Sequence, residues 1–209
     1  MMMLLKFLPD IIREGKGRQD NMKNLILTEL KKYPIIAAVK NEEELKASLK
    51  TKCQIVFILY GDICNIEKIA EAISSADKIA IVHMDLIGGL SSSDIAVQYL
   101  VENTKIDGVI STKSSLLKKA HEEGLITVQR VFMIDSMSLN NIQYHIKHGH
   151  ADFIEILPGV LPKAIRTIVN SSDIPIIAGG LVSDRDDVKI ILEAGAIAVS
   201  TSNNELWSY

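Results

Sequence analysis

Short apolar runs recur along the chain from residue 34 onward, and their regular spacing restricts the possible fold more than any other feature. Each run is rich in Ile, Val and Ala, and successive runs begin about 23 residues apart. The eight runs are PIIAAV (34–39), QIVFIL (54–59), KIAIVHM (78–84), DGVIS (107–111), LITVQRVF (125–132), DFIEIL (152–157), IPIIAG (174–179) and AIAVST (196–201). Runs of this length and composition, with no polar alternation, are typical of strands buried on both faces.

Stretches with helical spacing and charged faces separate these runs. The last of them, DRDDVKIILEAG, shows both helix signals: the acids Asp184, Asp186 and Asp187 cluster at its start, and Gly195 stops it. Strands that alternate with such helices predict a parallel sheet covered by helices. Eight strand–helix units predict a single-domain α/β fold, the (β/α)8 TIM barrel; the count of eight favours it over an open doubly wound sheet.

The ends of the chain differ from this pattern. Residues 1–21 are predicted to be a poorly ordered extension of unknown role, because Arg13–Asn21 is polar and contains glycine. Residues 22–209 are predicted to be the barrel domain, with a first helix that opens at Met22. Few residues remain for a last helix after the eighth strand, and Trp207 is expected to pack there.

Composition excludes several classes of function. The formal net charge is −3 and the pI about 6.0, so nucleic acid would have to bind through a local patch. Cys53 and Cys64 lack metal-type spacing, and HIKHGH (145–150) lies at a predicted helix end, where solvated histidines are expected. Cys64 follows the second strand without an evident base. No P-loop, dinucleotide fingerprint or zinc pattern is present, so we expect no metal and no cofactor.

The same features predict where the protein resides. The apolar start MMMLLKFLP is short, is broken by Pro9 and lacks a basic lead and a cleavage site, so it does not indicate a signal peptide. No run reaches the length that spans a membrane, and we expect a cytoplasmic protein without membrane contact.

The end of the seventh strand, IPIIAGGLVS, places two glycines where a barrel presents its functional mouth, at the carboxyl ends of the strands. Gly179 and Gly180 either shape a tight turn or leave backbone N–H groups open to an anion. The eighth strand ends in the hydroxyls of Ser200, Thr201 and Ser202, and a phosphate site commonly forms after these two strands. Gly159, after the sixth strand, either adds one more N–H or shapes its loop. The sequence therefore predicts a phosphate site here.

Charged side chains end several other strands. His83 and Asp85 end the third strand with the same parity, and the other polar strand-end groups are Lys40, Ser111, Thr112, Lys113, Arg130 and Glu155. Such charges are costly unless they are paired or face water. Two interpretations stay open: structural ion pairs, such as Arg130 with Asp85 or Glu155, and a polar pocket for a small hydroxylated ligand. The two are compatible.

Several longer stretches resemble the glycerol-3-phosphate-responsive antiterminators, regulators of glycerol uptake operons. The resemblance spans about residues 34–207 and rests on PIIAAVKNEEEL, IVHMDLIGGLSSSDIAVQYL, DGVISTKSSLLKKAHEEGLITVQRVFMIDS, DFIEILPGVLP, IPIIAGGLVSDRDDV and AGAIAVSTSNNELW. It implies a barrel that binds glycerol-3-phosphate and leader mRNA, so that transcription continues through a terminator. It implies no catalytic turnover.

The resemblance also implies roles for individual residues. The phosphate would lie against Gly159, Gly179, Gly180, Ser200, Thr201 and Ser202. Strand-end position, rather than the resemblance, suggests that the glycerol hydroxyls meet some of Lys40, Asp85, Lys113, Arg130 and Glu155. A patch around Lys113, Lys118 and Lys119 is a candidate contact for leader mRNA. A homo-oligomer stays open.

Two enzymes remain as alternatives. Glycerol-1-phosphate prenyltransferases share the glutamate-then-glycine element after strand six and the Gly-Gly turn after strand seven. They place an acidic metal-binding motif after strand one, where this chain reads VKNEEE. A lyase that uses Lys40 or Lys113 as a Schiff base is the second alternative.

Overall fold

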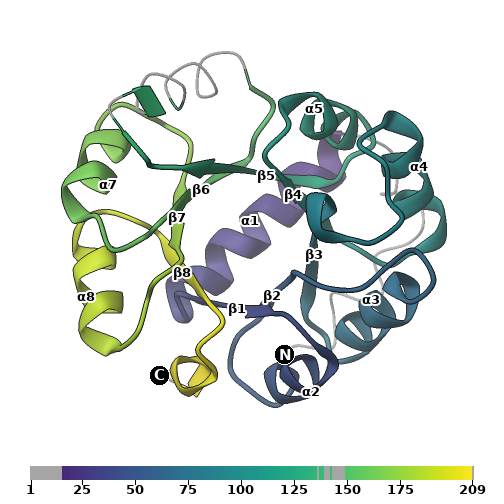
Figure 1. Ribbon diagram of the computed structural model, residues 1–209, viewed down its shortest axis with the longest axis horizontal. Coiled ribbons are helices and arrows are strands. Elements are labelled where there is room, and N and C mark those ends of the chain that lie inside the picture. The colour runs from purple at the N-terminus through teal and green to yellow at the C-terminus, as the bar shows by residue number, and fades with distance from the viewer. Residues whose placement is uncertain (1–15, 136, 139–141, 143–148, 209) are drawn as a thin grey trace.

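The computed structural model describes residues 16–135, 137, 138, 142 and 149–208 and contains a closed parallel barrel. Figure 1 shows the helices arranged around the strands. The strands follow one another in sequence order: β1 (Ile35–Val39), β2 (Ile55–Ile58), β3 (Ile79–His83), β4 (Gly108–Ser111), β5 (Ile126–Phe132), β6 (Phe153–Leu157), β7 (Ile176–Gly179) and β8 (Ala198–Thr201). All eight predicted strands are present, and the predicted (β/α)8 barrel is confirmed.

The helices between the strands lie where the charged stretches predicted them. They are α2 (Glu42–Ser48), α3 (Ile66–Ser75), α4 (Asp94–Asn103), α5 (Ser114–Glu122), α7 (Pro162–Val169) and α8 (Arg185–Glu193). Helix α8 illustrates the local cause: the Asp184 side chain accepts a hydrogen bond from the backbone N–H of Asp187, and Gly195 adopts φ +103° just beyond the helix. The chain ends in η3 (Asn204–Ser208), a 3-10 helix in which Trp207 is fully buried. Trp207 therefore packs as expected.

The first helix begins earlier than predicted. Helix α1 (Lys16–Lys32) includes six residues that we assigned to the extension, and one of them, Gln19, is buried. Its amide nitrogen contacts Leu125 O, Asp152 Oδ2 and His121 Nδ1 at 2.7–2.9 Å, at the amino ends of β5 and β6. Ile26 and Leu30 pack against the barrel interior. Helix α1 therefore closes the amino end of the barrel, which we call the floor; it runs diagonally across the barrel in Figure 1.

The barrel interior is filled by side chains from alternate positions of each strand. The inner cluster includes Ile36 and Ala38 of β1, Ile79 and Ile81 of β3, and Val128 of β5. The next inward positions toward the carboxyl ends are His83 in β3, Arg130 in β5, Glu155 in β6, Gly179 in β7 and Ser200 in β8. Polar residues thus replace the apolar core near the carboxyl end of the barrel, which we call the mouth.

Candidate ligand-binding site

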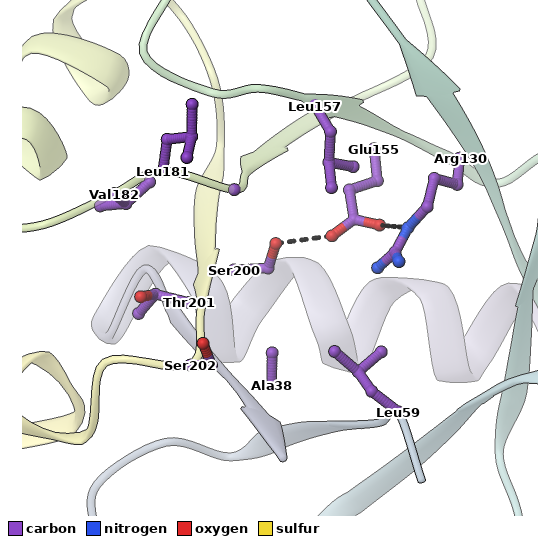
Figure 2. A pocket seen from close by; sticks show the side chains of 11 residues that line it. Ala38, Leu59, Arg130, Glu155, Leu157, Leu181, Val182, Ser200, Thr201 and Ser202 are labelled. Atoms are coloured by element: carbon purple, nitrogen blue, oxygen red, sulfur yellow. Dashed lines mark hydrogen bonds and ion pairs between the residues drawn. The ribbon is translucent and has the colours of Figure 1, made fainter. Parts of the chain in front are cut away.

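A pocket of about 140 Å³ opens at the mouth between β5, β6, β7, β8, β1 and β2. Figure 2 shows its walls. The lining residues are Ala38, Leu59, Arg130, Glu155, Leu157, Gly180, Leu181, Val182, Ser200, Thr201 and Ser202. The ends of the seventh and eighth strands therefore border one pocket, as the sequence predicted. Its volume is below the roughly 300–1,000 Å³ of drug-sized sites, so it suits a small ligand.

Gly179 allows the pocket wall to close tightly. A Cβ atom at this position would lie 2.0 Å from Ser200 Oγ and 3.2 Å from Glu155 Oε1. The space is instead taken by a buried hydrogen bond in which Ser200 Oγ donates to Glu155 Oε1 at 2.6 Å. The first glycine of the pair is thus required by a close approach of side chains.

The loop after β7 lines the pocket and contains unpaired backbone donors. Gly180 and Leu181 both adopt left-handed conformations, with φ of +74° and +60°. For leucine this conformation is strained, and such strain is found mainly at functional sites. Among the described residues, the N–H groups of Gly180, Leu181 and Ser202 have no hydrogen-bond partner. Successive free N–H groups suit an anion.

The three hydroxyls at the end of β8 have different environments. Ser200 Oγ is committed to Glu155, and Thr201 Oγ1 accepts a hydrogen bond from the Asn203 N–H at 3.0 Å. The Ser202 hydroxyl has no partner within the described chain and lines the pocket. Ser202 is therefore the hydroxyl best placed to meet a ligand, and Ser200 acts on the pocket through Glu155.

Gly159 differs from its predicted role as an anion donor. Its N–H donates to the carbonyl oxygens of Gly179 and Gly180, at 2.5 and 3.1 Å. A Cβ atom there would lie 2.9 Å from the Gly179 nitrogen. Gly159 thus shapes the contact between the loops after β6 and β7, which is the other interpretation that the sequence left open.

Arg130, Glu155 and Ser200 form a hydrogen-bonded chain across the pocket, drawn as dashed lines in Figure 2. Arg130 Nε donates to Glu155 Oε2 at 2.7 Å, and both side chains are buried. The ion pair that the sequence left open is therefore Arg130 with Glu155. Among the described residues, the two terminal guanidinium nitrogens of Arg130 have no hydrogen-bond partner. These nitrogens can therefore donate hydrogen bonds to a ligand, while the carboxylate of Glu155 balances the positive charge of the guanidinium.

The other predicted polar residues do not line this pocket. Lys40 is exposed, with its ammonium 3.8 Å from Glu44 Oε1. Asp85 accepts hydrogen bonds from the Thr112 N–H at 2.8 Å and from the Ser111 hydroxyl at 3.1 Å. Lys113 Nζ donates to Ser92 Oγ on the loop before α4. Of the five residues of which some were predicted to meet the glycerol hydroxyls, Arg130 and Glu155 line this pocket and Lys40, Asp85 and Lys113 do not. Their contact with a ligand stays a prediction.

His83 is a polar group that we had noted but not assigned to the site. Only 3% of it is exposed, and its Nδ1 has no hydrogen-bond partner. Burial, together with the nearby charge of Arg130, lowers the pKa of His83 to about 4. The imidazole is therefore neutral at physiological pH. The sequence did contain a signal for this position. His83 lies two residues after Ile81 and four after Ile79, so its side chain points to the same side of the strand, which is the barrel interior.

The remaining candidates give no second site among the described residues. Among the described residues, no group of three His, Cys, Asp or Glu side chains is arranged to hold a metal ion. Most of HIKHGH lies outside the described residues. The acids after β1 stand on α2, where Glu42 pairs with Lys46 and Glu44 accepts from the Lys40 N–H. They do not form the acidic metal motif of a prenyltransferase.

Two of the three lysines predicted to contact mRNA already contact other side chains. Lys113 contacts Ser92, and Lys119 pairs with Glu123 one turn along the chain, whereas Lys118 is exposed.

No described helix is both long and apolar enough to cross a membrane.

Comparison with known proteins assigns the family. Residues 35–207 match the family described as glycerol-3-phosphate responsive antiterminator. An uncharacterised protein of Escherichia coli (strain K12), YgcP, is 40% identical over 183 residues, which are 88% of this chain and 96% of that protein.

Two solved structures are similar over nearly the whole barrel. The glycerol uptake operon antiterminator regulatory protein of Listeria monocytogenes str. 4b F2365 has a TM-score of 0.81 and 32% identity, covering 84% of this chain and 95% of that one. A related protein of Thermotoga maritima MSB8 has a TM-score of 0.74 and 29% identity, covering 83% and 96%. The protein therefore belongs to the glycerol-3-phosphate responsive antiterminator family.

Proposed function

We propose that this protein is a glycerol-3-phosphate-responsive regulator that binds leader mRNA and permits transcription through a terminator. The observation that carries the ligand assignment is the mouth pocket, whose lining residues include Gly180, Leu181 and Ser202, with backbone N–H groups and one hydroxyl that lack partners among the described residues. Membership of the antiterminator family supports the regulatory part.

The phosphate lies at the ends of β7 and β8 in this proposal. Its oxygens accept hydrogen bonds from the N–H groups of Gly180, Leu181 and Ser202 and from the Ser202 hydroxyl. Gly179, Ser200 and Thr201 support this arrangement, and Gly159 holds the neighbouring loop. Each hydrogen bond to a charged group contributes roughly 1.5–3 kcal/mol, so these four supply about 6–12 kcal/mol against the cost of ordering the ligand.

The glycerol part extends toward Arg130. The free guanidinium nitrogens donate to hydroxyl oxygens, and Glu155 holds the guanidinium in place through its 2.7 Å hydrogen bond to Nε. The pair is neutral as a whole, which suits an uncharged polyol better than a second anion.

RNA binding follows from the family and not from overall charge. The chain has a net charge of −3, so RNA contacts have to be local and strongly dependent on salt. Glycerol-3-phosphate promotes them by favouring the mouth-loop conformation that is competent for RNA. This role requires no catalytic turnover.

The proposal is tested by measuring retention of leader RNA on filters at low salt, with and without glycerol-3-phosphate. We expect retention to increase with the ligand in the wild type and not in the Gly179→Ala variant, whose added Cβ displaces Ser200. Gly17→Ala is the matched control, because a Cβ at Gly17 meets no atom within 4 Å. Absence of retention with and without ligand would refute the regulatory assignment.

A further inference from the structure

His83 lies in a layer of side chains that points into the barrel beside the pocket. Barrel interiors are built from layers of four residues contributed by alternate strands. The strand registers place Ala38, His83, Arg130 and Gly179, all from odd-numbered strands, in the layer just inside the mouth. The layer therefore combines two long polar side chains with two of the smallest residues.

The small members of this layer shape the pocket in two ways. Ala38 lines it on the β1 side. Gly179 leaves room for the hydrogen bond between Ser200 and Glu155, and both of these residues line the pocket. The guanidinium of Arg130 reaches into it from β5, as Figure 2 shows. His83 enters the same layer from β3, between Ala38 and Arg130 in the order around the barrel. His83 does not itself line the pocket, but the shared layer places its imidazole behind the inner wall.

The Nδ1 atom of His83 is buried without a partner among the described residues. Asp85 Oδ2 lies 3.9 Å from this nitrogen, beyond hydrogen-bond distance. Asp85 is held away by three groups of β4 and the loop that follows it, namely the Ser111 hydroxyl and the N–H and hydroxyl of Thr112. Unpaired buried polar atoms are rare in folded proteins, and this one lies inside the functional end of the barrel.

The neutral imidazole and the guanidinium offer complementary chemistry. A neutral imidazole has one ring nitrogen that accepts a hydrogen bond, whereas the guanidinium only donates. A hydroxyl group does both: its oxygen accepts from Arg130, and its proton is donated to the imidazole. A carboxylate can only accept, so it would face the lone pair of the acceptor nitrogen.

We propose that His83 accepts, through Nδ1, a hydrogen bond from a ligand hydroxyl that Arg130 binds as a donor, so that the pair selects hydroxylated phosphate esters. This inference rests on the proposed ligand-binding function and adds a specificity residue to it. No covalent chemistry is involved. His83 acts only by accepting the hydrogen bond from the ligand hydroxyl.

The test measures affinity by titration calorimetry for three probes. They are glycerol-3-phosphate, n-propyl phosphate, which lacks both hydroxyls, and 3-phosphoglycerate, which keeps the 2-hydroxyl but has a carboxylate in place of the terminal hydroxyl that the proposal assigns to His83 and Arg130. We expect the wild type to bind glycerol-3-phosphate about 10-fold or more tightly than the other two. His83→Leu should lose about 10-fold for glycerol-3-phosphate and less than about twofold for n-propyl phosphate. His83→Asn, which keeps a polar group near the Nδ1 position, should recover part of the loss.

Ile81→Val is the control for packing, since Ile81 lies one inward position below His83 in the same strand. It should leave the ratio between glycerol-3-phosphate and n-propyl phosphate unchanged. A His83→Leu variant that weakens both esters equally, or neither, would overturn the inference while leaving the phosphate site intact. Failure of the wild type to bind any of the probes would overturn the proposed ligand together with this inference.

A second measurement does not depend on a folded variant. In the wild type, the Nδ1 resonance of His83 should shift when glycerol-3-phosphate is added and stay in place with n-propyl phosphate. Equal shifts with the two esters would contradict a hydrogen bond to the hydroxyl.

Discussion

The floor and the mouth of this barrel differ in how far their polar groups are paired by hydrogen bonds. At the floor, Asp152 Oδ2 accepts hydrogen bonds from the Gln19 amide and from the N–H and hydroxyl of Thr127, all at 2.9–3.0 Å. At the mouth, the N–H groups of Gly180, Leu181 and Ser202 and the Nδ1 of His83 lack partners among the described residues. Satisfied buried groups stabilise a fold, and the buried Nδ1 of His83 costs stability while it lacks a partner. The mouth N–H groups belong to half-buried or exposed residues and stay available to a ligand. The comparison separates a stabilising end from the end that we propose binds the ligand.

The largest effect on stability is expected from a substitution at the floor. Asp152→Ala removes the charged acceptor of three hydrogen bonds from Gln19 and Thr127 and leaves the buried Thr127 N–H without this partner, so we expect a loss of about 3 kcal/mol in the free energy of unfolding. Urea denaturation measures this loss, with the exposed Asp173→Ala as the control. Affinity for glycerol-3-phosphate at low temperature, where the variant stays folded, should be almost unchanged. A large loss of affinity with little loss of stability would contradict the division between the two ends.

The second prediction is that acid lowers the stability of the protein through His83 at the mouth. The native state takes up the His83 proton only near its pKa of about 4, whereas the unfolded chain takes it up near the ordinary pKa of 6.5. The unfolded state therefore binds more protons in this interval, and stability falls as the pH decreases from 6.5 to 4. The full loss is about 3 kcal/mol, at roughly 1.4 kcal/mol for each pKa unit.

Asp107 opposes this trend. Burial raises the pKa of its carboxyl to about 6, so the native state holds the additional proton between pH 3.8 and 6 and stability rises as the pH falls. His83→Phe should remove the acid-sensitive part and leave the opposite slope of Asp107. Urea unfolding at pH 7, 5.5 and 4.5 measures both proteins, and identical pH profiles would show that His83 does not stay neutral.

The third prediction closes the pocket. Gly179→Ala places a Cβ atom 2.0 Å from Ser200 Oγ and breaks the hydrogen bond from Ser200 to Glu155. We expect a loss of about 2 kcal/mol in stability and at least a ~10-fold loss of ligand affinity. Calorimetric titration of glycerol-3-phosphate measures the affinity, and Gly17→Ala should leave it unchanged. Wild-type affinity in the Gly179→Ala variant would place the ligand elsewhere.

The smallest expected effect releases strain at the mouth. Leu181 holds φ +60° although its side chain is 76% exposed, so a glycine there loses little packing and removes the conformational cost. Leu181→Gly should raise the free energy of unfolding by about 0.5–1 kcal/mol, part of the cost of a left-handed residue being offset by the entropy of the unfolded glycine. Thermal denaturation provides the measurement. Destabilisation would mean that the leucine side chain has a packing role.

Much of the fold was predictable because it depends on local pattern. Apolar runs located all eight strands, and the acids and glycine around α8 located its ends. The start of α1 was missed, since Gln19 is polar and its burial depends on Asp152, 133 residues away. Local sequence carries no signal for such a contact.

The candidate site was predictable to the same extent. Order along the chain placed the ends of β7 and β8 together and brought Arg130 and Glu155 into the pocket. It did not show that Lys40 turns toward Glu44, or that Asp85 is held by Ser111 and Thr112. Those outcomes depend on which partner a side chain reaches, and strand-end position leaves that choice open.

The central claim is that a small phosphate ester completes the unpaired donors of the mouth. A titration of the 15N-labelled protein with glycerol-3-phosphate, followed by amide chemical shifts, tests it most directly. The account predicts saturable shifts at Gly180, Leu181 and Ser202 and unchanged floor amides at Gln19 and Thr127. Saturable shifts at the floor, with the three mouth amides unmoved, would contradict it.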